Sequence, residues 1–223
     1  MTPEHRQFLL NTISPDSLWL LLAEAQAAGE GASIVRLGDG ERALLALRAG
    51  EPPAPYLADE SWLREYGLTG ADLLRIAAGL HEATERATWL APSPSGVLDP
   101  AYDLLPYLTP RDRWAPCYYG TQWVPCGRHR ELLAGQRVAL CTRQAIALAP
   151  AVAEHLGAPV VPLPVDSWRD RILAVERALE ERCTAALVSA GPPGKLLTVE
   201  LGDAGLLALD LGTSLRLWGG AAW

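Results

Sequence analysis

Two carboxylates separated by one glycine, Asp39-Gly40-Glu41, follow a short apolar segment, and their types and spacing suggest chemistry more directly than any other part of the chain. In an extended backbone, side chains two residues apart project to the same side, so both carboxylates would face one hard cation held by oxygen ligands. On a helix they would point about 200° apart. Gly38 and Gly40 allow the tight backbone and close ligand approach of such a site. The segment therefore predicts a metal site in which Asp39 and Glu41 are the ligands.

A helix start is the alternative interpretation of the same residues. Asp39 would cap a helix that continues to about Arg48, and Gly50 would close it. This interpretation accounts for Asp39 but not for Glu41, because a capping box that begins at Asp39 needs Glu or Gln at position 42, where the chain has Arg42. Both interpretations stay open on the local pattern.

The segment 191–195, Gly-Pro-Pro-Gly-Lys, joins an apolar strand to a helix and superficially resembles a phosphate-binding loop. Ser189 stands where that loop begins with glycine, Leu196 stands where a metal-binding hydroxyl is needed, and the two prolines remove N–H donors, so an ATPase is a poor fit. What remains is the N-terminus of a helix expected from Gly194 to Asp203, with Lys195 in its first turn and Gly191 in the turn before it. A cation there opposes the helix dipole unless an anion lies beside it. The alternative is a solvated lysine after a turn.

Asp210 ends the last predicted strand, where an acid is placed to hydrogen-bond a ribose or sugar hydroxyl or to cap the next turn. Aromatic residues in the preceding Pro-rich region, Tyr118, Tyr119 and Trp123 among them, are candidates for stacking on sugar faces. The alternative is that they hold their loop against the core. We take Tyr119 and Trp123 as the candidate acceptor-binding residues.

The order of predicted elements indicates the fold class. After a helix from Ser14 to about Gly29 and a strand from Ser33 to Leu37, the C-terminal part of the chain alternates strands with helices of 10 to 15 residues. This alternation predicts an α/β Rossmann-like layered fold, with a mainly parallel sheet flanked by helices. Ligands of such sheets bind beyond the carboxyl ends of the strands. Asp39, Thr142, Gly191 and Asp210 all lie at predicted strand ends.

Composition restricts the classes of function. The 223 residues carry a formal charge of −7 and show no Lys/Arg cluster, which argues against a nucleic-acid partner. Neither a signal-peptide core nor a transmembrane segment is apparent, so we expect a cytoplasmic protein. We expect one domain over residues 1–223, with an irregular acceptor-side loop region at about 91–125. The cysteines and histidines show no metal-ligand spacing.

Two separated motifs resemble one family. Ser33 to Glu41 resembles the Arg-Phe-Gly-Asp-Gly-Glu signature of the GT-D fold glycosyltransferases, with Leu37 in place of Phe. The stretches 187–197 and 208–212 are similar to that family's closing Gly-Pro-x-x-Lys-x-Leu and Asp-Ile-Gly-His segments, with Thr213 in place of His. The order and spacing of these motifs cover residues 30–218, and the match is poor over the region at 91–125.

The resemblance implies an enzyme that transfers a sugar, expected to be a hexose, from a nucleoside diphosphate donor, expected to be a UDP-sugar, to a glycan, glycoprotein or small molecule. It implies that Asp39 and Glu41 are catalytic, holding Mn²⁺ or Mg²⁺ against the diphosphate. Arg36, Gly38, Gly40, Gly191, Lys195 and Asp210 are then the substrate-binding residues. The alternatives are a non-catalytic sugar-nucleotide-binding protein of the same fold, or another Rossmann-like transferase such as a methyltransferase.

Overall fold

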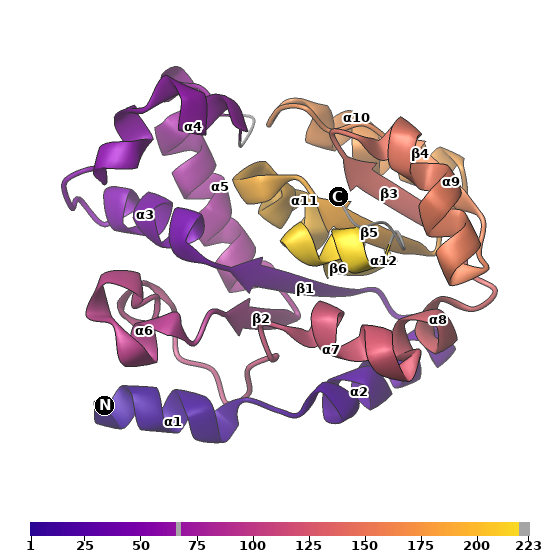
Figure 1. Ribbon diagram of the computed structural model, residues 1–223, viewed down its shortest axis with the longest axis horizontal. Helices are drawn as coiled ribbons and strands as arrows, with labels where there is room; N and C mark the ends of the chain where they lie inside the picture. The colour runs from indigo at the N-terminus through magenta and orange to yellow at the C-terminus, as the bar shows by residue number, and fades with distance from the viewer. Residues whose placement is uncertain (66–67, 219–223) are drawn as a thin grey trace.

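The computed structural model describes residues 1–65 and 68–218. Its centre is a six-stranded sheet in the order β2-β1-β6-β5-β3-β4, in which all neighbouring strands are parallel (Figure 1). The α/β layered fold expected from the sequence is therefore confirmed. The strands are β1 (Ala32–Leu37), β2 (Trp89–Pro92), β3 (Val138–Thr142), β4 (Val160–Leu163), β5 (Ala185–Ser189) and β6 (Leu207–Asp210). The helices are α1 (Pro3–Asn11), α2 (Pro15–Ala27), α3 (Asp39–Arg48), α4 (Glu60–Glu65), α5 (Leu73–Arg86), α6 (Ser95–Leu98), α7 (Tyr119–Cys126), α8 (Arg128–Leu133), α9 (Ala145–Leu156), α10 (Asp170–Glu180), α11 (Gly191–Asp203) and α12 (Leu215–Trp218), with short 3-10 turns between several of them.

Helices cover both faces of the sheet, and the alternation of side chains along each strand decides which face a residue serves. In β5, Ala185 and Leu187 belong to a cluster with α2, α7, α8, α9 and α12, whereas Ala186 and Val188 pack on the side of α10 and α11. α3 and α5 extend that second layer over β1 and β2 (Figure 1). All these strand residues are fully buried. The double coverage explains why the strands are continuously apolar in sequence.

The region 91–125 contains more regular structure than the sequence indicated. Its first two residues complete β2, the edge strand beside β1, and α7 lies at its end. Strand β2 has only four residues, Trp-Leu-Ala-Pro, and directly precedes a Pro-rich stretch, so its apolar signal is short. Between β2 and α7, α6 and two 3-10 turns lie within residues 95–107, and residues 108–118 belong to no helix or strand.

A close contact between α11 and β1 fixes the position of the site. A Cβ atom at Gly31 would lie 2.0 Å from the carbonyl oxygen of Gly202, and one at Gly202 would lie 2.8 Å from Cβ of Ser33. Two glycines thus let the end of α11 approach the start of β1 at a distance that side chains would prevent. The same helix carries Lys195 near its N-terminus, so this contact sets where Lys195 lies relative to β1.

Candidate active site

A cleft of about 690 Å³ lies at the carboxyl ends of the central strands. Its walls come from the segments that follow β1, β3, β5 and β6, together with residues after β2 and β4. This is the edge at which parallel sheets bind their ligands. Most of the residues predicted from sequence line it, namely Arg36, Gly38, Asp39, Gly40, Glu41, Gly191 and Lys195.

The backbone at Asp39 and Glu41 is helical, so the expectation of an extended segment with two converging carboxylates is wrong. Asp39 is the first residue of α3, and Gly38 precedes it as the N-cap. Oε2 of Glu41 accepts a hydrogen bond of 2.9 Å from the N–H of Gly38. The capping interaction therefore begins at Gly38, one residue earlier than the alternative interpretation required, and this accounts for Glu41 at the third helical position.

The two carboxylates consequently have different surroundings. Asp39 is exposed at the cleft, and its carboxylate has no hydrogen-bond or ion-pair partner among the described residues. Glu41 is 9% exposed, and its other oxygen, Oε1, lies 3.4 Å from Nζ of Lys195. No group of three or more His, Cys, Asp or Glu side chains suited to a metal ion occurs in the described residues. Asp39 is thus the carboxylate that is free to bind a ligand.

Lys195 is a buried cation between two carboxylates, not the solvated lysine of the alternative interpretation. It is 5% exposed, and its Nζ lies 2.6 Å from Oδ2 of Asp210 in addition to its contact with Glu41. Burial on its own would lower the pKa of Lys195, but the charges of Asp210 and Glu41 more than offset this and raise that pKa above its usual value. The anions that compensate for the unfavourable helix dipole therefore belong to the protein itself.

Asp210 and Arg36 are held by internal contacts in the same network. Asp210 is 2% exposed, and its Oδ2 also accepts the backbone N–H of Arg36 at 2.9 Å. The interpretation of Asp210 as a residue that reaches a sugar hydroxyl is therefore not supported. The guanidinium of Arg36 donates to the carbonyl oxygens of Cys117 and Leu211. It lines the cleft from a fixed position.

The two aromatic residues assigned to the acceptor are core residues, and that assignment is wrong. Tyr119 is fully buried and donates its hydroxyl to the carbonyl oxygen of Asp210 at 2.8 Å. Trp123 is 1% exposed and donates Nε1–H to the carbonyl oxygen of Pro15. The neighbouring Tyr118, which is 49% exposed, is the aromatic side chain of this group that lines the cleft. A helical turn places adjacent residues on different faces, and the sequence did not indicate which face is buried.

Several polar residues of the cleft were missed or only partly anticipated from the sequence. Arg143 and Arg216 are exposed there, as is Asp166, whose carboxylate lies 3.5 Å from Nε of Arg143. Thr142 ends β3 and contributes to the same wall. The rule that ligands bind beyond strand ends pointed to Thr142 and, by adjacency, to Arg143. Arg216 lies in the short helix α12, for which the sequence carries no comparable signal.

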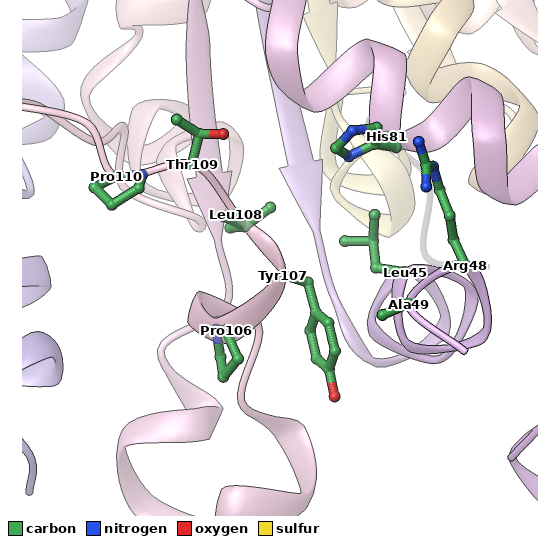
Figure 2. A pocket seen from close by; sticks show the side chains of 9 residues that line it. All are labelled: Leu45, Arg48, Ala49, His81, Pro106, Tyr107, Leu108, Thr109 and Pro110. Atoms are coloured by element: carbon green, nitrogen blue, oxygen red, sulfur yellow. The ribbon is translucent and has the colours of Figure 1, made fainter. Parts of the chain in front are cut away.

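A second hollow, of about 410 Å³, lies between α3, α5 and the segment 106–110. Figure 2 shows Arg48 and His81 on one wall and the side chains of Pro106 to Pro110 on the other. Arg48 is in the last turn of α3, whereas Asp39 begins that helix at the strand ends. This hollow is therefore separate from the cleft and from the residues predicted to be catalytic or to bind substrate.

No helix in the described part of the chain has the length and apolar character needed to cross a membrane.

Comparisons with known proteins agree with this architecture. Residues 121–217 match the family model of the GT-D fold-like domain. A solved structure described as the highly conserved domain of unknown function 1792, with a distinct glycosyltransferase fold, superposes with a TM-score of 0.64 at 14% identity, covering 94% of this chain and 80% of that chain. A new glycosyltransferase (DUF1792) from Streptococcus sanguinis gives a TM-score of 0.57 at 16% identity, covering 91% and 81%. A search of curated proteins found no matching sequence. The resemblance to the GT-D fold is therefore confirmed, and the chain has a glycosyltransferase fold.

Proposed function

We propose that the protein is a metal-dependent glycosyltransferase that uses a nucleoside diphosphate sugar, with UDP-sugars as the first donors to test. The observation that carries the proposal is the cleft at the strand ends, where the unpartnered carboxylate of Asp39 begins α3 within a glycosyltransferase fold. The solved structure from Streptococcus sanguinis is itself described as a glycosyltransferase. The side chains of the cleft, a free carboxylate and several arginines, are of the types that bind a metal ion and a diphosphate.

The donor set fits a divalent cation that is shared with the substrate. Mg²⁺ and comparable ions are commonly bound through one or two carboxylates together with substrate phosphates and water. Asp39 supplies one such carboxylate, whereas Glu41 is engaged by Lys195 and by the N–H of Gly38. When bound, the ion would neutralise the charge that develops on the departing diphosphate. We therefore assign Asp39 as the metal ligand and Glu41 as the residue that fixes the N-terminus of α3.

Cationic groups near this end of the cleft suit a diphosphate. Arg216 is exposed in α12, and Arg36 lines the cleft at the end of β1. Arg36 comes shortly before the turn that carries Asp39, and Arg216 follows β6, the strand that pairs with β1. Since arginine pairs well with phosphate oxygens, this end of the cleft is the donor end.

The proposal is tested by thermal shift and isothermal titration with UDP, GDP and ADP, each with and without Mn²⁺. We expect stabilisation by at least one diphosphate only when metal is present. The variant Asp39→Asn should abolish the metal-dependent stabilisation by the diphosphate. The control Asp166→Asn removes another exposed carboxylate of the same cleft and should preserve that stabilisation. Equal metal-dependent affinity in wild type and Asp39→Asn would contradict the metal assignment. Stabilisation by S-adenosylmethionine alone would favour a methyltransferase.

A non-catalytic sugar-nucleotide-binding protein is the second candidate, and the engagement of Glu41 by Lys195 favours it because only one of the two carboxylates is free. Slow hydrolysis of a UDP-sugar in the presence of Mn²⁺ distinguishes the two functions. A transferase releases UDP at a rate that falls in Asp39→Asn. A binding protein takes up the donor with the same dependence on Asp39 but releases no UDP above the background without protein.

A further inference from the structure

The turn between β3 and α9 has the features of an oxyanion site at the other end of the same cleft. It comprises Thr142, Arg143 and Gln144, which all line the cleft, followed by the first residues of α9. We propose that this turn binds a phosphoryl group of the acceptor. The inference rests on the proposed function, and it adds to that function a chemical class for the acceptor.

Thr142 is a largely buried residue that provides a hydroxyl without a protein partner. The residue is 7% exposed and lines the cleft, and in the part of the chain that the structure describes its hydroxyl has no hydrogen-bond partner. Its neighbour across the sheet, Ser189, does have one, because its hydroxyl donates to the carbonyl oxygen of Gly212. A hydroxyl that has no protein partner and lies at a cleft can donate a hydrogen bond to a ligand oxygen.

The N-terminus of α9 lies directly after this hydroxyl. Helix α9 has 12 residues and no side-chain cap, because Gln144 at the N-cap accepts no hydrogen bond from the first turn. The N–H groups of Ala145, Ile146 and Ala147 therefore lack a side-chain acceptor, and they carry the positive end of the helix dipole. Together with Thr142 they offer several donors to one oxyanion.

Arg143 adds a positive charge beside these donors. It is exposed, and one of its nitrogens donates to the carbonyl oxygen of Arg64 at 3.1 Å. Asp166 lies 3.5 Å from its Nε and partly opposes an anion. The side chains of Arg143 and Asp166 are 49% and 64% exposed, so solvent weakens their interaction and leaves the guanidinium able to reorient toward a ligand.

The position in the sheet separates this turn from the donor end. The order β1-β6-β5-β3 places three strand spacings, or about 14 Å, between the turn after β1 and the turn after β3. The two phosphates of a diphosphate share one bridging oxygen and do not span that distance. A phosphoryl group at the β3–α9 turn therefore belongs to a second substrate, and in a transferase the second substrate is the acceptor.

The probe for this site is inorganic phosphate, titrated calorimetrically into the full chain. We expect Thr142→Val and Arg143→Gln each to weaken phosphate binding on the order of tenfold. Gln144→Asp should also weaken it while raising the melting temperature, because the new carboxylate caps α9 and occupies the place of the anion. The matched control is Arg137→Gln, which removes an arginine just before β3, at the opposite end of that strand, and should leave phosphate binding unchanged.

A second titration is made with the protein saturated by UDP and Mg²⁺. Unchanged phosphate affinity supports the proposal, because it shows two separate anion sites. Competition between phosphate and UDP would overturn it, and so would equal phosphate affinity in wild type, Thr142→Val and Arg143→Gln, or an absence of phosphate binding. If phosphate binds as expected but no nucleoside diphosphate binds, the proposed function fails and the assignment to a glycosyl acceptor fails with it, while the oxyanion site itself is retained.

Discussion

Replacing Lys195 by Met tests whether the buried cation stabilises the fold. The substitution keeps most of the side-chain volume but leaves two buried carboxylates, Asp210 and Glu41, without their cation. Removing one partner of a buried ion pair typically costs about 3–5 kcal/mol. Here each carboxylate keeps one backbone N–H, from Arg36 and Gly38 respectively, so we expect a loss near 3 kcal/mol. For a chain of this length that corresponds to a fall in melting temperature of about 6–12 °C.

Urea unfolding at pH 7 measures this loss as a change in the transition midpoint at constant slope. In the wild type the pKa of Lys195 is raised above its usual value. The stabilisation of the folded state by its positive charge is therefore fully present at neutral pH and is lost only as the pH rises through that alkaline pKa. The double variant Lys195→Met/Asp210→Asn should regain part of the stability, because the amide is neutral and still accepts a hydrogen bond. A loss below about 1 kcal/mol in Lys195→Met would refute the reasoning.

Two further predictions concern the helices around α7. Burial lowers the pKa of His129 to about 4. The stability of the folded state should therefore fall as the pH drops from about 6.5 toward 4, because the unfolded state binds the proton first. In His129→Gln the urea midpoint should depend less on pH over that range. Trp123→Ala should cost about 3–5 kcal/mol and Tyr119→Phe about 1 kcal/mol, since both side chains lie in the core. Thermal unfolding measures both losses, and a normally stable Trp123→Ala protein with impaired acceptor use would restore its assignment to the acceptor.

The strands of the C-terminal part were predictable because each is a short apolar run between clear turn or helix signals. The alternation expected there agrees with the structure, in which β3, α9, β4, α10, β5, α11 and β6 follow one another along the chain. The cleft could also be located in advance, because the rule about strand ends depends on topology alone. The edge strand β2 could not be predicted, since its apolar run has only four residues and such short runs also occur in loops.

The roles of individual charged residues were harder to predict than their location. The types and spacing of Asp39 and Glu41 did not reveal that Gly38 is the N-cap of α3, which engages the carboxylate of Glu41 and leaves that of Asp39 open to the cleft. The pairing of Lys195 with Asp210 joins α11 to the carboxyl end of β6, the next element along the chain. Such pairs depend on tertiary geometry, and local pattern carries no information about them. For the same reason the sequence did not indicate the contact of 2.8 Å between the Nε2 atoms of His129 and His155.

The place of β6 in the sheet has a consequence for how the protein folds. It is the last strand along the described chain, yet it lies between β1 and β5 and is the link between the β2-β1 pair and the β5-β3-β4 group. Until β6 docks, those two groups have no shared strand, and Lys195 has no Asp210 beside it. The sheet is therefore dominated by contacts of high sequence separation, which slow folding. During synthesis on the ribosome, neither the continuous sheet nor the cleft is complete before residue 210 has left the exit tunnel.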